Sequence, residues 1–273
     1  MDYLNHLVLS PLSYITTLRI EQPQLNTKWA IFGRVYQHLA HPHLTKPSLV
    51  GDIGVLVNVR VEDFEDIIHM GNLKHLRFAD SWSMSTILPY LRASVLEALI
   101  IRNWYPEGFS TPDHNYSFPS LHAFAFEQSD YEYTDLGSWD WDCYIFRFLS
   151  ILTKHAVYIA FSHFSSLESA FLFPRHKAFW PDLQVINFNV KYSTRRDDYL
   201  IFATARARGK KLRFVLRIHC ELINRWRVED LNALNELQRA CDVGAMATAD
   251  MSAALISNRA WPLLLMQSGR MTF

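Results

Sequence analysis

The chain has 273 residues, of which 49% are hydrophobic and 14% are aromatic, and only 9 are glycine. This composition can bury enough apolar surface to offset the entropy of the chain, so it excludes a disordered or low-complexity protein. Lysine plus arginine equals aspartate plus glutamate at 27 each, which leaves no overall positive field to attract nucleic acid or an anionic membrane. We therefore expect a folded protein that binds neither nucleic acid nor a membrane.

The cysteines and the apolar runs predict the cellular compartment. Cys143, Cys220 and Cys241 are widely spaced and odd in number, which suits neither a disulfide framework nor a C-x-x-C metal site and is typical of a reducing compartment. The apolar stretch near the start is interrupted by Pro11 and follows no basic leader, so it makes a poor signal peptide. No run approaches the roughly 20 apolar residues of a membrane-spanning helix. We expect an intracellular protein, cytoplasmic or nuclear.

One apolar pattern recurs along the chain and decides the expected architecture. It consists of an apolar residue, two others, a second apolar residue, one other and a third apolar residue. The copies that start at 73, 96 and 121 lie 23 and 25 residues apart, within the roughly 20 to 29 residues of leucine-rich repeats. The middle residues Leu76, Leu99, Phe124 and Ile186 are expected to be buried on adjacent parallel strands. The copies are ITTLRI (15–20), LKHLRF (73–78), LEALII (96–101), LHAFAF (121–126), LESAFL (167–172) and LQVINF (183–188).

The segments before several strands predict amphipathic helices. In 62–70, Phe64, Ile67 and Ile68 fall on one helical face, and acidic residues occupy the first turn, where the helix dipole favours them. In the last such segment, Gly209 is expected to stop the helix. The segments are EDFEDIIHM (62–70), MSTILPYLR (84–92), in which Pro89 shortens or kinks the helix, WDCYIFRFLSIL (141–152) before AVYIAF, and RDDYLIFATARARGKK (196–211) before LRFVLRIH.

These alternating elements predict an α/β fold. Each unit of helix and strand has an apolar face that it cannot bury alone. Stacked units would therefore form an irregular leucine-rich-repeat-like solenoid, with parallel strands on the concave side and helices outside. The helical spacing of Leu231, Leu234 and Leu237 predicts a helical C-terminal cap or tail. We place the repeat domain at 1–224 and the cap at 225–273.

Five segments within residues 50 to 220 carry a family resemblance: GNLKHLRFADS, SVLEALIIRN, FPSLHAFAFEQ, FSSLESAFLFP and WPDLQVINFNV. They resemble the irregular leucine-rich-repeat region of the large fungal F-box protein family, especially that of mushroom-forming fungi. In that family an N-terminal F-box docks to the adaptor of a cullin ubiquitin ligase, and the repeats are thought to recruit a target protein. The resemblance therefore implies a substrate receptor.

The F-box signature, a leucine-proline start followed by an acidic residue and a helical run, is not recognisable in the first residues. SPLSYITTLRI (10–20) already has the pattern of a repeat strand. We therefore expect the cullin adaptor to bind only if a divergent F-box is present. The expected partner is a target protein whose identity the sequence does not give.

The residues that could carry chemistry do not form a recognisable catalytic or cofactor motif. His38, His41 and His43 form the densest histidine group. Pro42 breaks the helix that could align them, and no cysteine or acidic residue lies close by, so a surface loop is favoured over a metal site. No nucleophile elbow, phosphate-binding glycine loop or zinc-protease motif occurs. We expect no catalytic residue, no metal and no cofactor; the alternative is an enzyme or enzyme fragment with an unrecognised site.

Two further segments leave alternatives open. RARGKKLR (206–213) could contact phosphate or RNA, but basic residues at a helix end also complement the helix dipole, and this structural role is favoured. The acidic and aromatic segment 129–142 is either an exposed recognition loop or a loop buried in the core.

The expected working surface is the concave face of the sheet. Side chains alternate along a strand, so the residues that flank the buried middle position point to this face. We expect the charges of Arg77, Arg102 and Glu127 to be exposed there, and arginine is enriched at binding hot spots. The alternatives are a solvated face with no partner and, for the apolar members, burial beneath an insertion. The residues expected to bind a protein target are His75, Arg77, Arg102, Glu127 and Asn187.

Overall fold

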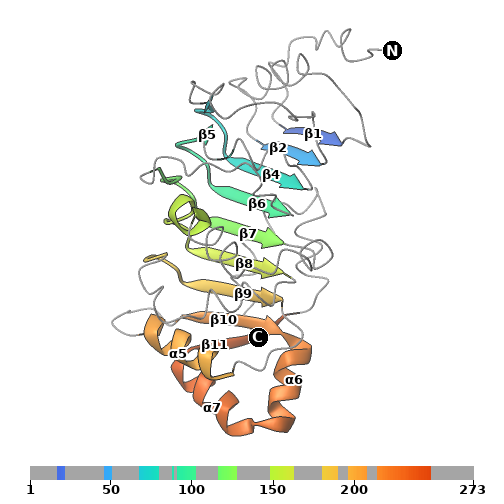
Figure 1. The fold of residues 1–273 in the computed structure, drawn as a ribbon, viewed down its shortest axis with the longest axis vertical. Helices are drawn as coiled ribbons and strands as arrows, with labels where there is room; N and C mark the ends of the chain where they lie inside the picture. Colours follow the sequence, from blue (N-terminus) through green and yellow to red (C-terminus); the bar gives the residue numbers. More distant parts are fainter. Residues whose placement is uncertain are drawn as a thin grey trace, which may run out of the picture. The chain divides into compact units, whose positions relative to one another are not determined.

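The computed structural model of the chain consists of two compact units, Met1–Ser120 and Leu121–Phe273. Parallel strands form the sheets of both units, and helices accompany them in the second (Figure 1). The predicted α/β class is therefore confirmed. The residues that the structure describes are 17–21, 46–50, 68–79, 88, 91–102, 116–127, 148–162, 180–189, 196–207 and 214–246.

The described strands of the first unit form two parallel sheets. The smaller sheet pairs β3 (Ile68–His69) with β5 (Leu91–Arg92). In the larger sheet the strands follow one another in chain order, and each pairs in parallel with the next. Its strands are β1 (Thr17–Glu21), β2 (Lys46–Val50), β4 (His75–Ala79) and β6 (Ala98–Arg102).

The apolar positions of β4 and β6 coincide across the sheet. Leu76 is the register partner of Leu99, and Phe78 is the partner of Ile101. All four side chains are buried, because they lie at the second and fourth strand positions and share the core face. The predicted burial of Leu76 and Leu99 on adjacent parallel strands is confirmed.

A β-turn precedes each of these two strands and is closed by the same kind of hydrogen bond. The Leu73 N–H donates to the Met70 carbonyl oxygen at 3.3 Å, and the Leu96 N–H donates to the Ala93 carbonyl oxygen at 3.2 Å. Turn-forming residues such as Gly71 lie between donor and acceptor. Both leucines are buried, at 1% and 0% exposure, so each turn fixes an apolar anchor just before its strand.

Two of the predicted helices are wrong where the structure describes them. Ile68–His69 and Leu91–Arg92 are strands, although both fall in segments expected to be helical. The Met70 N–H donates to the Arg92 carbonyl oxygen at 2.8 Å, so the backbone here finds its partners in the neighbouring strand. Pro89 also cannot donate a helical hydrogen bond. Pairing with the neighbouring strand therefore satisfies the backbone hydrogen-bonding groups of these two segments, although the helical periodicity of their side chains predicted helices.

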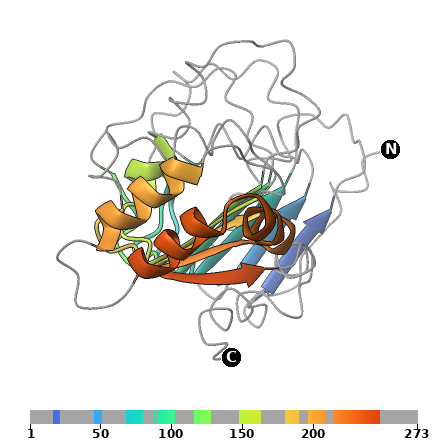
Figure 2. The same ribbon diagram turned by 90° about the horizontal axis from the view of Figure 1, so that it is seen from below.

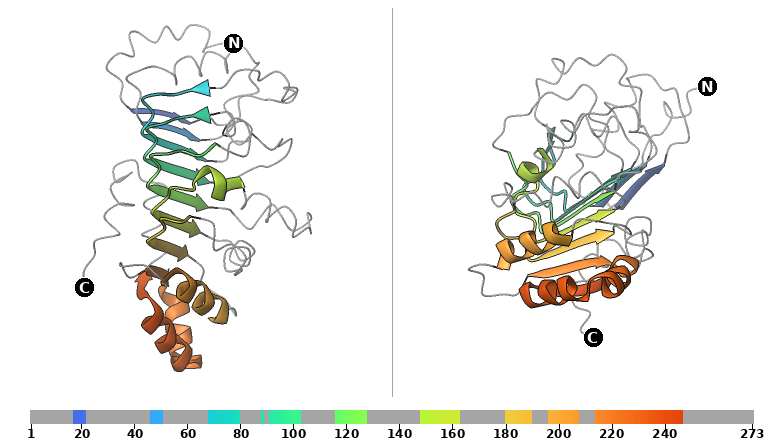
Figure 3. Two further views of the ribbon diagram at one scale, coloured as in Figure 1. Left: turned by 90° about the vertical axis from the view of Figure 1, so that its left-hand side faces the viewer. Right: turned by 60° about the horizontal axis from the view of Figure 1, so that its bottom comes forward.

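The second unit contains a parallel sheet of the described strands in chain order. Two of its described helical segments, 148–152 and α5 (Arg196–Ala207), fall where helices were predicted before strands. Figures 2 and 3 show α5, α6 (Cys220–Glu229) and α7 (Leu231–Ala240) gathered beside β10 (Val215–His219) and β11 (Asp242–Met246). The strands are β7 (Ala123–Glu127), β8 (Tyr158–Ser162), β9 (Val185–Asn189), β10 (Val215–His219) and β11 (Asp242–Met246).

The expected neighbours Phe124 and Ile186 lie on strands that do not pair with each other. Ile159 of β8 is the register partner of both, so β8 lies between β7 and β9. All three residues are fully buried. The burial was predicted correctly, and the intervening strand comes from AVYIAF, which lacks the leucine of the repeat pattern. The copy LESAFL (167–172) lies outside the described residues.

The C-terminal part is helical only in part. The helices α6 (Cys220–Glu229) and α7 (Leu231–Ala240) connect β10 to β11, and the spacing of Leu231, Leu234 and Leu237 correctly predicted the helix α7. Leu234 and Leu237 are buried there, whereas Leu231 is 52% exposed. Asp242–Met246 is a strand parallel to β10 and not a helix, which corrects the prediction of a helical cap at this point. The boundary predicted between 224 and 225 falls inside α6.

Aromatic rings join the sheet of the second unit to its helices. The Phe161 ring stacks on Phe188 with centroids 6.0 Å apart, and Phe188 meets Tyr199 of α5 edge to face at 5.4 Å. Tyr199 in turn contacts Trp226 of α6 at 5.3 Å. Because Phe161 and Phe188 occupy the fourth strand position, α5 and α6 cover the face formed by the second and fourth positions. The core of this unit therefore lies between the sheet and the helices.

A buried hydrogen-bond network fixes the turn before β9. Trp180 has a φ of 48°, and its Nε1–H donates to the Thr153 hydroxyl at 2.8 Å. Arg206 of α5 donates to the Trp180 carbonyl oxygen at 2.9 Å. Burial lowers the pKa of Arg206 to about 10, so its guanidinium stays charged at neutral pH. The structural role predicted for the basic segment holds for Arg206; residues 208–213 lie outside the described part.

Removing the acceptor of this network should destabilise the second unit. We expect Thr153→Val to lower the free energy of unfolding by about 1–3 kcal/mol, because the buried Trp180 Nε1–H then loses its acceptor. Thr153→Ser keeps the hydroxyl and should lose clearly less. Urea denaturation followed by circular dichroism measures both variants. Equal losses would show that the methyl group, and not the hydrogen bond, matters at this position.

In the first unit, the Tyr116 side chain contacts Arg92 and Ala93, which precede β6. The Ala93 N–H donates to the Tyr116 hydroxyl oxygen at 2.8 Å, and the Arg92 guanidinium lies 3.9 Å from the ring centroid. Phe118 contacts the ring edge to face. Burial raises the pKa of the Tyr116 hydroxyl above its usual 10.0, whereas the Ala93 hydrogen bond and the Arg92 charge act in the opposite direction.

Tyr116→Phe should lower the free energy of unfolding by about 1–2 kcal/mol at pH 8, because the buried Ala93 N–H loses its acceptor. The folded state holds the Tyr116 proton more tightly than the unfolded state, so wild-type stability falls as the pH rises above 10. Tyr116→Phe has no hydroxyl that titrates at this position, so its stability does not fall above pH 10 for this reason. The stability gap between the two proteins should therefore narrow above pH 10 in chemical denaturation, and a gap that widens would contradict the assigned burial.

Among the helices that the structure describes, none has the length and apolar character needed to cross a membrane.

Candidate interaction face

The first, third and fifth positions of the strands point to the side opposite that of the second and fourth positions, and we call this side the polar face of each unit. In the first unit, β4 contributes His75 and Arg77 to it, and β6 contributes Ile100 and Arg102. His75 and Arg77 are only 6% and 5% exposed, and Ile100 is also buried, whereas Arg102 is half-buried. The predicted exposure of Arg77 is therefore wrong.

The strand register explains this difference between the two arginines. Arg77 occupies the middle of β4, with Ser48 and Ile100 as its register partners on either side. Arg77 therefore has a strand on either side, and its side chain is 5% exposed. Arg102 is the last residue of β6, where the strand ends and solvent is reached. Within the first unit, Arg102 is the predicted site residue that a partner could reach.

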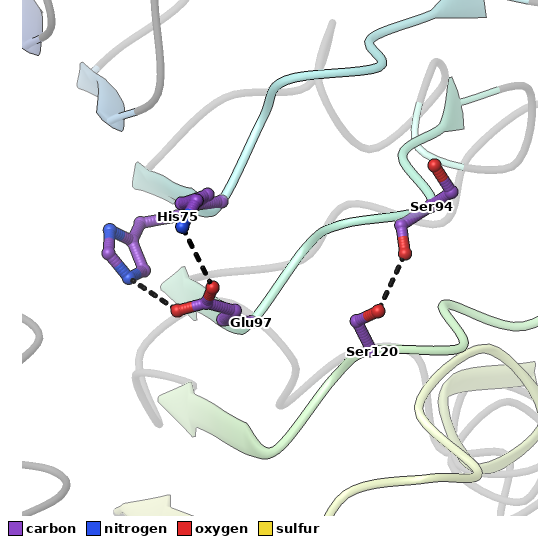
Figure 4. Close-up of polar contacts among 5 residues, drawn as sticks. His75, Ser94, Glu97 and Ser120 are labelled. Atoms are coloured by element: carbon purple, nitrogen blue, oxygen red, sulfur yellow. Dashed lines mark hydrogen bonds and ion pairs between the residues drawn. The ribbon is translucent and has the colours of Figure 1, made fainter.

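An ion-pair cluster lies at the starts of β4 and β6 (Figure 4). Lys74 Nζ lies 3.3 Å from Glu97 Oε1, and His75 Nε2 lies 3.6 Å from Glu97 Oε2. The Ser120 hydroxyl donates to the Ser94 carbonyl oxygen at 2.8 Å (Figure 4). The Lys74 side chain is 51% exposed and that of Glu97 is 35% exposed, so solvent screens the pair and its contribution to stability is small. The cluster joins successive strands and positions His75.

The polar face of the second unit brings together Tyr158, Asn187 and Arg217. The Asn187 side-chain amide donates to the Tyr158 hydroxyl, and Asn187 is 2% exposed. Asn187 is the register partner of Ala160 on one side and of Arg217 on the other. Arg217 is half-exposed, and no hydrogen bond or ion pair joins its guanidinium to the described residues of this unit. The predicted site residue Asn187 is therefore buried, whereas its register partner Arg217 is accessible to solvent.

His219 is the last residue of β10, and its side chain caps the helix α6 that follows. Its Nδ1 accepts a hydrogen bond from the Glu221 N–H at 3.2 Å and caps α6. The side chain is 2% exposed. His219 therefore completes the first turn of α6 and is not part of the accessible face.

Sequence reasoning missed Arg217 and Tyr158, although a signal for both exists. In VLRIH (215–219), Leu216 and Ile218 are the apolar positions, so the alternation of period two places Arg217 on the opposite face. Tyr158 is placed in the same way by Ile159 and Phe161. The side chain of Glu127, a predicted site residue on β7, lies outside the described part.

The other chemical candidates can be placed only in part. His38, His41 and His43 lie outside the described residues, as does the segment 129–142. In the described parts of the chain, no three His, Cys, Asp or Glu side chains come close enough together to hold a metal ion. Cys241 is buried and Cys220 is half-buried, and both are free thiols.

Comparisons of the chain with models of protein families, with curated proteins and with solved structures find no match.

Proposed function

We propose that the chain is a protein-binding module built from irregular leucine-rich repeats, and that it recruits the target protein of an F-box-type ubiquitin ligase receptor. A β-turn closed by a hydrogen bond, a buried leucine and a five-residue strand recur at 70–79, 93–102 and 180–189. This recurrence supports a repeat architecture. The similarity of the same segments to the repeat regions of fungal F-box proteins supports the link to a ubiquitin ligase.

The accessible arginines of the polar face are the observation that carries the proposal of protein binding. Arg102 is half-exposed on the polar face of the first unit, and Arg217 is half-exposed on the polar face of the second. Most of the other described side chains on each of these faces are buried. A guanidinium offers a planar fork of donors that suits carboxylates of a partner. His75 and Tyr158 on these faces are buried, and the accessible arginines bind groups but do not serve as nucleophiles or general bases at neutral pH, so the accessible positions suit recognition rather than catalysis.

An affinity capture with matched charge reversals tests the proposal. Immobilised chain is incubated with extract of a mushroom-forming fungus, and captured proteins are quantified by mass spectrometry. We expect Arg102→Glu to reduce the yield of a reproducible partner at least fivefold, because the half-exposed Arg102 meets that partner. Arg239→Glu, at an exposed position on α7, should leave the yield unchanged. Both variants should melt within a few degrees of the wild type.

Two outcomes of the capture experiment would contradict different parts of the proposal. Equal yields from wild type and Arg102→Glu would show that the polar face of the first unit does not bind the partner. The absence of any reproducible partner would contradict the proposal as a whole.

Coupling to the ligase is tested separately by size-exclusion chromatography with the purified cullin adaptor. We expect the two proteins to elute apart, because no F-box signature is recognisable in residues 1–20. Stoichiometric co-elution would overturn this expectation and reveal a divergent F-box.

A further inference from the structure

The strand β11 forms an edge of the sheet in the second unit. It pairs with β10 on one side, and no described strand pairs with its other side (Figure 1). Solvent reaches this edge, because Ala245 is exposed and Val243 is half-exposed, whereas their register partners Ile218 and Leu216 on β10 are fully buried. Natural sheets often protect an exposed edge with lysine or proline, and β11 contains neither. The edge can therefore accept a further strand.

The backbone groups of Val243 and Ala245 point outward from this edge. The Asp242 N–H donates to the Phe214 carbonyl oxygen at 2.9 Å, so the backbone groups of Asp242 face β10. In a parallel pair, the N–H and C=O groups of one residue face the same neighbouring strand, and this direction alternates along the chain. Val243 and Ala245 therefore present two donors and two acceptors to the open side, where no described strand pairs with them. An extended peptide segment carries the complementary groups at the same spacing.

Arg217 places a positive charge beside this edge. It is half-exposed on the polar face of β10, and its register partner Gly244 lies between it and the open side. A Cβ built on Gly244 would lie 3.4 Å from Arg217 Cγ and 4.0 Å from its Nε, so the arginine side chain extends over β11 at this position. The missing side chain of Gly244 leaves this path open. A strand added roughly 4.8 Å beyond β11 would therefore meet the Arg217 charge on the polar face.

We infer that the β11 edge binds an extended segment of the target protein by strand addition, with an acidic residue of that segment opposite Gly244. In the antiparallel orientation, two residues of the segment exchange hydrogen bonds with Val243 and Ala245, and the residue between them faces Gly244. Residues opposite each other share one face of a sheet, so the acidic side chain lies on the polar face, where the planar fork of Arg217 binds its carboxylate. The inference rests on the proposed function, because it states what the target presents.

Nuclear magnetic resonance titration of the full chain, labelled with nitrogen-15 in alanine, tests the edge directly. The probe is the peptide Ac-Thr-Val-Asp-Val-Thr-NH2, and the Ala245 amide cross-peak is identified by its loss in Ala245→Pro. We expect this cross-peak to shift saturably, because the Ala245 N–H gains an acceptor. A peptide with both valines N-methylated should not bind, since it lacks the two donors that face β11. N-methylation of the aspartate should be tolerated, because its N–H points away from β11.

Variants of the chain separate the backbone contribution from the charge. Ala245→Pro removes one outward N–H at an edge position that tolerates proline, so it should abolish binding and melt within a few degrees of the wild type. Arg217→Lys should weaken binding at least fivefold, because the planar fork is lost, whereas Arg239→Lys on α7 should not. A peptide with asparagine in place of aspartate should bind at least fivefold more weakly. If Ala245→Pro does not fold, the N-methylated peptides test the same hydrogen bonds on the unaltered chain.

An Ala245 cross-peak that stays in place at the highest soluble peptide concentration would overturn the inference. Equal binding of the peptide with N-methylated valines would exclude strand addition, and equal binding of the asparagine peptide would remove the preference for an acidic residue. A chain that sediments as a dimer, and as a monomer after Ala245→Pro, would assign the edge to a second copy instead. If the chain captures a partner yet the peptide does not bind, the edge site alone fails. If the peptide binds but no partner is captured, the proposed function fails.

Discussion

Leu99→Ala should lower the free energy of unfolding by about 2–5 kcal/mol, because Leu99 is fully buried and its removal leaves a cavity. Leu99 lies on β6 opposite Leu76 of β4, so the cavity would open between two strands that share the core of the first unit. Such a loss is a large part of the stability of a typical domain. Thermal and urea denaturation should both detect it.

The matched control is Leu231→Ala on α7. Leu231 is 52% exposed, so the same truncation removes little buried surface and should change stability by within about 0.5 kcal/mol. Similar losses in the two variants would mean that Leu99 is not a core residue and that the alignment of the repeated segments is wrong.

In the second unit, Phe188→Ala is expected to cost about 3–5 kcal/mol. Phe188 is 1% exposed and links the sheet to α5, since it stacks on Phe161 and meets Tyr199 edge to face. Its loss removes ring contacts on both sides and opens a cavity between sheet and helix. The near-ultraviolet circular dichroism of the folded variant should also weaken, because these rings lose their fixed packing.

Phe188→Leu provides the control for this prediction. Leucine fills most of the cavity but cannot stack, so we expect it to recover more than half of the stability that alanine loses. If leucine proves as damaging as alanine, ring geometry rather than buried volume determines the stability of this core.

The strands were predictable from the sequence because their apolar residues alternate with period two. Leu76 with Phe78, and Ile186 with Phe188, mark strands that the structure has in the same places. The helix α5 was predictable for a similar reason, since its apolar residues follow a helical period. The leucine-rich-repeat class itself stays a proposal.

The strands that were not predicted from the sequence form by pairing with strands that are distant in the sequence. Ile68–His69 and Leu91–Arg92 were assigned to helices, but their backbones pair with each other across 23 residues of sequence. Asp242–Met246 contains a glycine and no apolar run, and only its pairing with β10 makes it a strand. The periodicity of apolar residues and their strand or helix propensity describe local preferences. They therefore cannot reveal which distant strand provides the hydrogen-bond partners of a backbone segment.

The candidate site shows the same limit. Alternation along the strand correctly assigned Arg77 and Asn187 to the face opposite the core, but it could not say that both are buried. Burial depends on what lies over the face and on the neighbours in register. The strand that contains Arg217 was predicted, but Arg217 was not assigned to a face, although the apolar neighbours Leu216 and Ile218 place it opposite the core side.

Site-specific photo-crosslinking tests most directly whether the polar face binds the target protein. A p-benzoylphenylalanine is placed at position 215, where the half-exposed Val215 lies two residues before Arg217 on β10, and in a second variant at position 228, where Val228 is 88% exposed on α6. After irradiation in fungal extract, we expect a covalent adduct with the captured partner from position 215 and none from position 228. Adducts from position 228 alone would contradict it, because the partner would then bind the helices and not the sheet.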